Sequence, residues 1–92
     1  MNLHKDKLKS YRCRACGLEQ DFQPWGEDGI TPAFEICGCC GVDFGYQDCT
    51  PASVKKFREE WLKKGGQWLI SGEKPSNWSL EEQLKLIPQE YK

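Results

Sequence analysis

The spacing of apolar residues predicts an amphipathic helix in the middle of the chain. Its apolar positions recur at intervals of three and four residues: Val54, Phe57, Trp61 and Leu62. Thr50 followed by Pro51 supplies a hydroxyl N-cap and a proline at the first helical position, and Gly65-Gly66 provides the stop. We therefore predict a helix over residues 50–65.

A second, shorter pattern near the end predicts another helix. Ser79 with Glu82 three residues later fits a capping box, and Pro88 ends the pattern. Three apolar residues in between share one helix face: Leu80, Leu84 and Ile87. A helix over residues 79–88 is expected.

The chain before residue 50 has no helical spacing and instead shows short alternating or apolar runs. Residues 9–12, 18–22 and 33–36 each have the length and pattern of a short β-strand. Residues 1–8 are polar and without periodicity, so we expect a flexible lead-in there. Residues 9–92 are then one small domain, with the metal-binding part at 9–48 and the two helices after it.

Two matched cysteine turns are the strongest chemical signal in the sequence. Each reads Cys-x-x-Cys-Gly, and together they supply Cys13, Cys16, Cys37 and Cys40. Such a turn aims both sulfurs at one point, and the glycine after it allows a left-handed backbone. Four sulfurs in a tetrahedron suit Zn²⁺ or a single iron ion, Fe²⁺ or Fe³⁺. We predict one metal ion per chain on these four cysteines, with a pair of disulfides as the alternative.

Two further cysteines leave alternatives open. Cys39 lies inside the second turn, so Cys37 and Cys39 would make a Cys-x-Cys pair, but the matched register of the two turns favours Cys40. Cys49 is interpreted as a small buried hydrophobic residue. The alternatives are a thiol that exchanges with the site, or a Cys39–Cys49 disulfide formed under oxidation.

Charge and composition narrow the environment and the partners. Residues 17–50 contain no Lys or Arg and seven acidic side chains, which disfavours nucleic acid as the partner. The first predicted helix carries several lysines that could contact phosphate groups, so a nucleic-acid-binding protein is retained as an alternative. The first residues lead to no apolar run, so neither a signal peptide nor a membrane span is expected. A cytoplasmic protein follows, in which clustered cysteines bind metals more often than they form disulfides.

The sequence predicts no catalytic residues. Four thiolates leave no coordination position for water, so metal-assisted hydrolysis is not expected. His4 is the single histidine, and in a lead-in segment it is interpreted as a solvated side chain. We expect a non-enzymatic protein that binds another protein, with some of its four tryptophans available for contact.

The cysteine turns and the residues between them resemble rubredoxin. The similarity rests on the two Cys-x-x-Cys-Gly turns, on Tyr11 before the first turn, and on Asp28-Gly29-Ile30 and Phe34-Glu35 between them. It implies one iron on Cys13, Cys16, Cys37 and Cys40, single-electron transfer, and Tyr11 and Phe34 packed near the site. The segment between the turns is shorter than in rubredoxin, Gly38 replaces the usual proline, and a helical tail follows.

The chain is also similar to the bacterial cysteine-rich CPCC-type small proteins and to zinc ribbons. That similarity rests on Phe34-Glu35-Ile36-Cys37-Gly38-Cys39-Cys40 and on Ser79-Leu80-Glu81-Glu82. Together the two resemblances imply a small α+β metal-bound domain with zinc-ribbon or rubredoxin-like short antiparallel β-hairpins and two C-terminal helices. The expected function is a structural zinc site in a protein-interaction module, with a rubredoxin-like iron electron carrier as the alternative.

Overall fold

Residues 10–50, which carry the cysteines, are folded without β-strands. The computed structural model describes residues 10–92, so the predicted lead-in over residues 1–8 and His4 lie outside the described part. Within residues 10–92 the pairing is limited to two isolated antiparallel bridges, Arg12 with Glu19 and Ile36 with Asp43. The predicted β-hairpins, and with them the zinc-ribbon or rubredoxin-like fold, are wrong.

Backbone turns close to these bridges limit their extension into strands: Phe34 has a left-handed φ of 57° and Gly45 a φ of 99°, one on each arm of the second bridge. Pro24 follows the first pairing closely, and Pro32 precedes the second. Proline has no N–H to donate to a ladder, and the chain turns at Pro24 and through the loop at residues 26–29. The predicted strands therefore form short arms of the cysteine turns: two of them flank the first turn, and the third leads into the second turn.

The helix α2 (Pro51–Lys63) matches the predicted central helix but ends two residues earlier. The Thr50 hydroxyl accepts a hydrogen bond from the Ser53 N–H at 3.1 Å, and the Ser53 hydroxyl accepts one from the Thr50 N–H at 3.2 Å. This capping box fixes the start of the helix. Of the predicted apolar stripe, Val54 and Trp61 are buried and Leu62 lies at the surface.

The helix α3 (Leu80–Leu84) is shorter than the predicted span 79–88. Ser79 is its N-cap as predicted, accepting a hydrogen bond from the Glu82 N–H at 3.3 Å. After Leu84 the hydrogen bonds span three residues instead of four: the Leu86 N–H donates to Gln83 O. Because residues before a proline avoid helical geometry, Pro88 prevents another helical turn, and the chain ends in the 3₁₀ helix η2 (Gln89–Tyr91).

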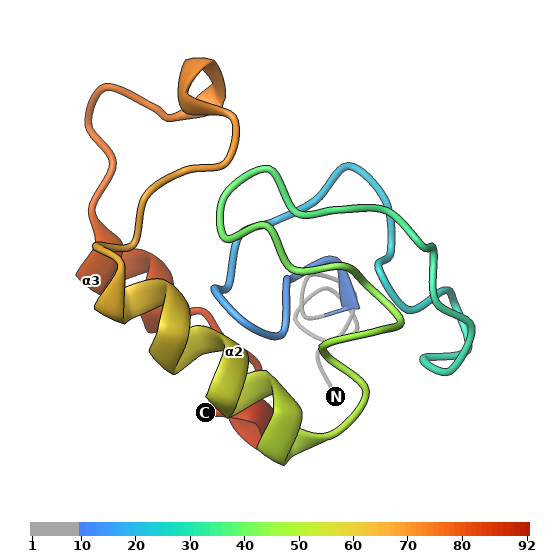
Figure 1. Cartoon of the computed structure of the whole chain (residues 1–92). Helices are drawn as coiled ribbons and strands as arrows, with labels where there is room; N and C mark the ends of the chain where they lie inside the picture. Colours follow the sequence, from blue (N-terminus) through green and yellow to red (C-terminus); the bar gives the residue numbers. More distant parts are fainter. Residues whose placement is uncertain (1–9) are drawn as a thin grey trace.

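Five of the cysteines are themselves part of the hydrophobic core: Cys13, Cys16, Cys37, Cys39 and Cys40. The core also holds Ala15, Val42, Phe44, Val54 and Trp61. A loop containing the 3₁₀ helix η1 (Ser71–Glu73) connects α2 to α3 and projects from the rest of the molecule (Figure 1). No helix among the described residues is both long enough and apolar enough to cross a membrane.

Candidate metal centre

The site is built from two segments with the same backbone geometry. In the first cysteine loop (residues 11–20), the Cys13 N–H donates to Leu18 O and the Gly17 N–H donates to Cys13 O, both at 2.9 Å. The second cysteine loop (residues 35–44) repeats this pattern of hydrogen bonds. Each loop thus presents two cysteines from a closed turn that is fixed by main-chain hydrogen bonds.

In the second cysteine loop the Cys37 N–H donates to Val42 O at 3.0 Å and the Gly41 N–H donates to Cys37 O at 2.9 Å. The outer hydrogen bonds correspond as well, since Gln20 N–H to Tyr11 O is matched by Phe44 N–H to Glu35 O. The repeat therefore extends beyond the Cys-x-x-Cys-Gly turns to both flanking arms.

The four predicted ligand cysteines are brought together at one point. The sulfurs of Cys13, Cys16, Cys37 and Cys40 all lie within 4.8 Å of one another. Cys13 Sγ lies 3.7 Å from Cys40 Sγ, and Cys16 Sγ lies 3.7 Å from Cys37 Sγ. A tetrahedral zinc ion with Zn–S bonds of about 2.3 Å places its sulfurs about 3.8 Å apart. The cluster therefore fits one metal ion, as the sequence predicted.

The cluster is closed to solvent and contains no disulfide. Three of its cysteines are fully buried and Cys40 is 7% exposed. All six cysteines are free thiols, so the alternative of two disulfides is not what the structure contains. Four buried sulfurs around one point are the arrangement of a structural metal site, where no position is open to water.

The thiols strongly affect one another's ionisation. Burial raises the pKa of Cys16 and of Cys40 well above the ordinary thiol value. The Cys13, Cys16 and Cys40 thiols hydrogen-bond Cys37 and lower its pKa. One thiolate is thus stabilised by its neighbours, while further negative charge is disfavoured in the same small volume. A bound metal cation would supply the missing positive charge and favour loss of the remaining thiol protons.

Gln83 of α3 joins the two cysteine loops. Its side chain is buried, and its Nε2 donates to Cys16 O at 3.2 Å and to Cys39 Sγ at 3.4 Å. Its Oε1 accepts a hydrogen bond from Trp78 Nε1 at 2.7 Å. A second amide, Gln20 Nε2, donates to Cys37 Sγ at 3.4 Å. Such hydrogen bonds around metal ligands orient the sulfurs and tune their basicity.

The carbonyl groups inside each turn are satisfied differently in the two loops. In the first loop, Arg58 of α2 donates from Nε to Ala15 O at 2.6 Å and from Nη2 to Arg14 O at 3.0 Å. Arg58 also donates to Tyr91 O, and burial lowers its pKa. One guanidinium therefore joins the first turn, α2 and the C-terminal segment.

In the second loop the equivalent carbonyls accept from main-chain donors. The Leu69 N–H donates to Cys39 O and the Ile70 N–H donates to Gly38 O, both at 2.9 Å. The polypeptide after α2 thus does for the second turn what the Arg58 side chain does for the first.

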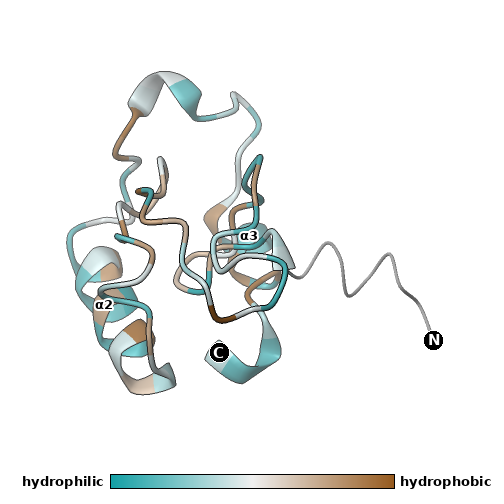
Figure 2. Ribbon diagram, turned by 90° about the vertical axis from the view of Figure 1, so that its right-hand side faces the viewer, coloured by the Kyte–Doolittle hydropathy of each residue, from teal (hydrophilic) through white to brown (hydrophobic). Residues whose placement is uncertain are grey.

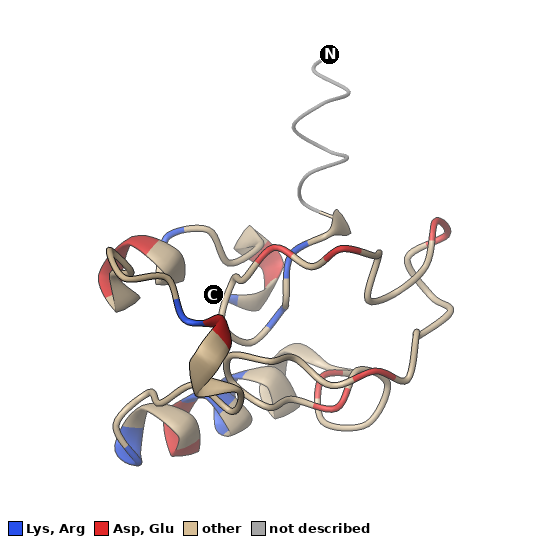
Figure 3. Ribbon diagram, turned by 90° about the horizontal axis from the view of Figure 1, so that it is seen from above, with Lys and Arg blue, Asp and Glu red and all other residues tan. Residues whose placement is uncertain are grey.

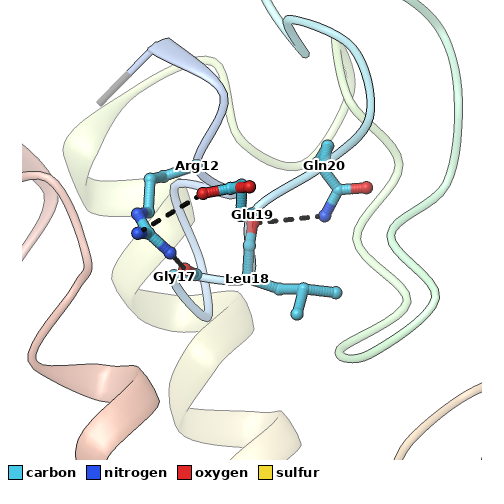
Figure 4. Close-up of polar contacts among 5 residues, drawn as sticks. All are labelled: Arg12, Gly17, Leu18, Glu19 and Gln20. Carbon is cyan, nitrogen blue, oxygen red and sulfur yellow. Dashed lines mark hydrogen bonds and ion pairs between the residues drawn. The ribbon is translucent and has the colours of Figure 1, made fainter. Parts of the chain in front are cut away.

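Arg12 holds the outer edge of the first loop (Figure 4). Its Nη1 donates to Gly17 O at 3.2 Å and its Nη2 lies 3.7 Å from Glu19 Oε1. The amide of Gln20 also donates to Leu18 O at 3.3 Å. The contacts of Arg12 join the incoming arm to the turn and to the outgoing arm, whereas the contact of Gln20 lies within the outgoing arm.

The remaining cysteines differ in position. Cys39 is fully buried, and its sulfur is not part of the group that converges on one point. Cys49 is exposed, so its interpretation as a buried hydrophobic residue is wrong; its thiol donates to Gly45 O at 3.3 Å. Both are free thiols, so the structure contains no Cys39–Cys49 disulfide.

One packing expectation from the rubredoxin resemblance is also wrong. Phe34 is 64% exposed, and its ring packs edge-on against Tyr46 with the centroids 6.3 Å apart. It therefore lies at the surface and not against the sulfurs. Tyr11 is half-buried and belongs to the first cysteine loop, where its carbonyl accepts from Gln20.

Arg58 and Gln83 were missed by the sequence analysis, although a signal for each was present. Arg58 lies four residues after Val54 and three before Trp61, on the buried face of α2. Gln83 lies three residues after Leu80 and four before Ile87 on the apolar face of α3. A polar side chain inside an apolar stripe needs a buried hydrogen-bond partner, and here the partners are the cysteine turns.

The chain is similar in sequence to a known protein. This chain is 32% identical over 72 residues to the uncharacterized protein YoaQ of Bacillus subtilis strain 168. The alignment covers 62% of this chain and spans 61% of that protein. No protein-family model and no solved structure matches the chain.

Proposed function

We propose that this protein holds one structural Zn²⁺ on Cys13, Cys16, Cys37 and Cys40 and acts as a non-catalytic protein-interaction module. The observation that carries the proposal is the convergence of four buried sulfurs within 4.8 Å from two loops far apart in the sequence. When bound, the ion supplies a cross-link between the loops, and its binding free energy becomes folding free energy.

Burial supports a structural role over a catalytic one. Catalytic zinc keeps one coordination position for water or substrate, whereas here all four donors are cysteines with little or no exposed surface. The hydrogen bonds of Gln83, Arg58 and the Leu69 N–H serve to position the turns around the sulfurs.

Surface composition supports an interaction role. Several large apolar side chains are at least about half exposed: Ile30, Phe34, Ile36, Tyr46, Leu69, Ile70 and Leu86. Single exposed apolar residues are ordinary, but this number on a chain of 92 residues provides contact area for another protein.

The test is the metal content of untagged protein purified under reducing conditions from medium with both zinc and iron. Mass spectrometry should give one zinc per chain, and the protein should be colourless. A red protein with one iron, reversibly bleached by dithionite, would replace this proposal with an electron carrier, because four thiolates accept either metal. Protein that folds fully with no metal would overturn the structural role.

A further inference from the structure

A groove of 360 Å³ lies beside the four-cysteine site. One wall is formed by residues 18–22, where the chain leaves the first cysteine loop. The other wall is formed by the projecting loop at residues 68–75. Ile36 and Gly38 of the second cysteine loop lie between these walls. The groove is therefore formed by segments that the metal site itself holds in place.

The groove combines apolar walls with acidic side chains. Its apolar lining includes Leu18, Phe22, Ile36, Trp68 and Ile70, of which Ile36 is 54% and Ile70 48% exposed. The apolar stretch that leads into the projecting loop is brown in Figure 2.

Three carboxylates line the groove, from Glu19, Asp21 and Glu73, and no Lys or Arg does. Two basic residues lie nearby: Arg12 pairs with Glu19, one of these three carboxylates, and Lys74 lies over the ring of Trp78, so the acidic character of the groove rests on Asp21 and Glu73. In Figure 3 the two cysteine loops carry several acidic segments, drawn red. Within these loops, basic residues, drawn blue, occur only in the first loop. The groove therefore favours a positively charged ligand.

One residue that lines the groove, Trp68, has a buried polar atom without a hydrogen-bond partner among residues 10–92. Trp68 Nε1 is shielded from solvent and has no hydrogen-bond acceptor among residues 10–92. Its ring packs edge-on against Trp78 at 5.6 Å between centroids. A buried N–H without an acceptor costs free energy.

We propose that this groove, called here the acidic groove, binds an extended segment of a partner protein that presents a Lys or Arg next to an apolar side chain. The apolar residue packs between Ile36 and Ile70, and the cation pairs with Asp21 and Glu73. The proposal rests on the proposed interaction function and names its surface and the chemistry of its partner.

The experiment selects peptides from a displayed library of random sequences on the zinc-loaded protein. Enriched peptides should contain Lys or Arg within two residues of an aliphatic or aromatic residue. The Kd of the strongest peptide, measured by calorimetry, should increase with added salt because the charges are solvent-accessible. Enrichment of peptides without basic residues, or no enrichment at all, would overturn the proposal.

A charge-reversal variant tests the location. Asp21→Lys with Glu73→Lys should raise the Kd at least about tenfold, because like charges then face the peptide cation. The matched control is Glu59→Lys with Glu60→Lys on the exposed surface of α2, which should leave the Kd within about twofold. Equal losses in both variants, or no loss in either, would contradict binding in the acidic groove.

Two further readouts separate the possible failures. Zinc content and thermal unfolding of each variant show whether the module is folded and metal-loaded. Loaded, folded protein that binds peptides outside the groove would overturn only this inference, whereas protein without zinc would overturn the proposed function. Sedimentation should show no dimer; a dimer lost in the groove variant would assign the groove to a second copy and overturn the proposal.

Discussion

The two cysteine loops have the same interior and different support. Both close with the same pair of main-chain hydrogen bonds, and Ala15 in the first occupies the position of Cys39 in the second. Outside the turns they differ. In the first turn the carbonyls of Arg14 and Ala15 depend on one side chain, Arg58, while the equivalent carbonyls of the second turn accept from the N–H groups of Leu69 and Ile70.

This difference shows which parts of the site are sensitive to mutation. A main-chain donor is present whatever the side chain, so the second turn tolerates substitution at the residues that support it. In the first turn the carbonyls of Arg14 and Ala15 lose their donor with a single substitution, that of Arg58 in α2. The four-cysteine cluster is symmetrical, but the groups that support its two loops are not. Substitutions in the two loops and their supporting groups should therefore separate the metal's contribution to stability from that of the packing.

The largest effect is expected from removing a ligand in either loop. Cys13→Ser and Cys37→Ser should each abolish tight zinc binding and unfold most of the domain, because apparent zinc binding free energies of structural sites are about 10–16 kcal/mol. Equal losses are expected since both sulfurs belong to one cluster. Zinc content and near-ultraviolet circular dichroism measure the result.

Cys49→Ser is the matched control for these variants, because the exposed Cys49 thiol lies outside the four-sulfur cluster. It should retain full zinc content and lose less than about 0.5 kcal/mol of stability. If it lost the ion as Cys13→Ser does, the ligand assignment would be wrong.

The two turn glycines should give the next largest difference. Both have left-handed backbones, with φ of 86° at Gly17 and 81° at Gly41. A Cβ at Gly17 would lie 2.5 Å from Gln83 O, whereas one at Gly41 would approach nothing closer than Leu69 at 3.8 Å. Gly17→Ala should therefore cost about 3 kcal/mol and Gly41→Ala about 1–2 kcal/mol of unfolding free energy.

Chemical denaturation of the zinc-loaded variants measures both values. Equal losses at the two glycines would mean that the contact between the first turn and α3 does not constrain the fold. A greater loss in Gly41→Ala would reverse the comparison.

A smaller effect is expected from the groups that support each turn. Arg58→Ala removes the side-chain donors to Ala15 O and Arg14 O and should cost about 2 kcal/mol. Arg58→Lys should recover less than half of this loss, because an ammonium group does not reproduce the guanidinium fork. Leu69→Ala keeps the main-chain donor of the second turn and should cost less than about 1 kcal/mol, since the side chain is 59% exposed.

Thermal unfolding at matched zinc concentration ranks these three variants, and Lys55→Ala on the exposed surface of α2 is the control for loss of a positive charge. A Leu69→Ala protein less stable than Arg58→Ala would show that the loops are not supported in the way their hydrogen bonds indicate.

A small effect should come from making the second turn resemble the first. Cys39→Ala replaces the extra buried thiol with the residue found at the equivalent position, Ala15. The contact from Gln83 Nε2 to the Cys39 sulfur is lost together with the packing of that buried sulfur, at a cost of about 1 kcal/mol, and zinc binding should be unchanged. Zinc content below one per chain in this variant would place Cys39 among the ligands.

The sequence predicted the four converging cysteines because their chemistry is local: each Cys-x-x-Cys-Gly turn closes within a few residues. It predicted the start of α2 for the same reason, since Thr50, Pro51 and Ser53 form the cap among themselves. The strands were wrong because alternation around a cysteine turn also describes arms that pair once and then diverge, as at Phe34 and Gly45 beside the second bridge.

Long-range contacts could not be predicted from these patterns. Arg58 reaches residues more than forty positions away, and Gln83 joins segments that only the folded chain brings together. Periodicity shows that both side chains lie on buried helix faces, but it does not identify which carbonyls they meet. The exposure of Cys49 depends in the same way on how the segment before α2 crosses the surface.

The most direct test of the central claim is a Co²⁺ titration of the metal-free, reduced protein, followed by visible absorption. The account predicts the spectrum of a tetrahedral four-thiolate site that saturates at one ion per chain in the wild type and in Cys39→Ala, and that is lost in Cys40→Ser. Saturation at one ion per two chains, or a spectrum that survives Cys40→Ser but not Cys39→Ala, would contradict a site made by Cys13, Cys16, Cys37 and Cys40 of a single chain.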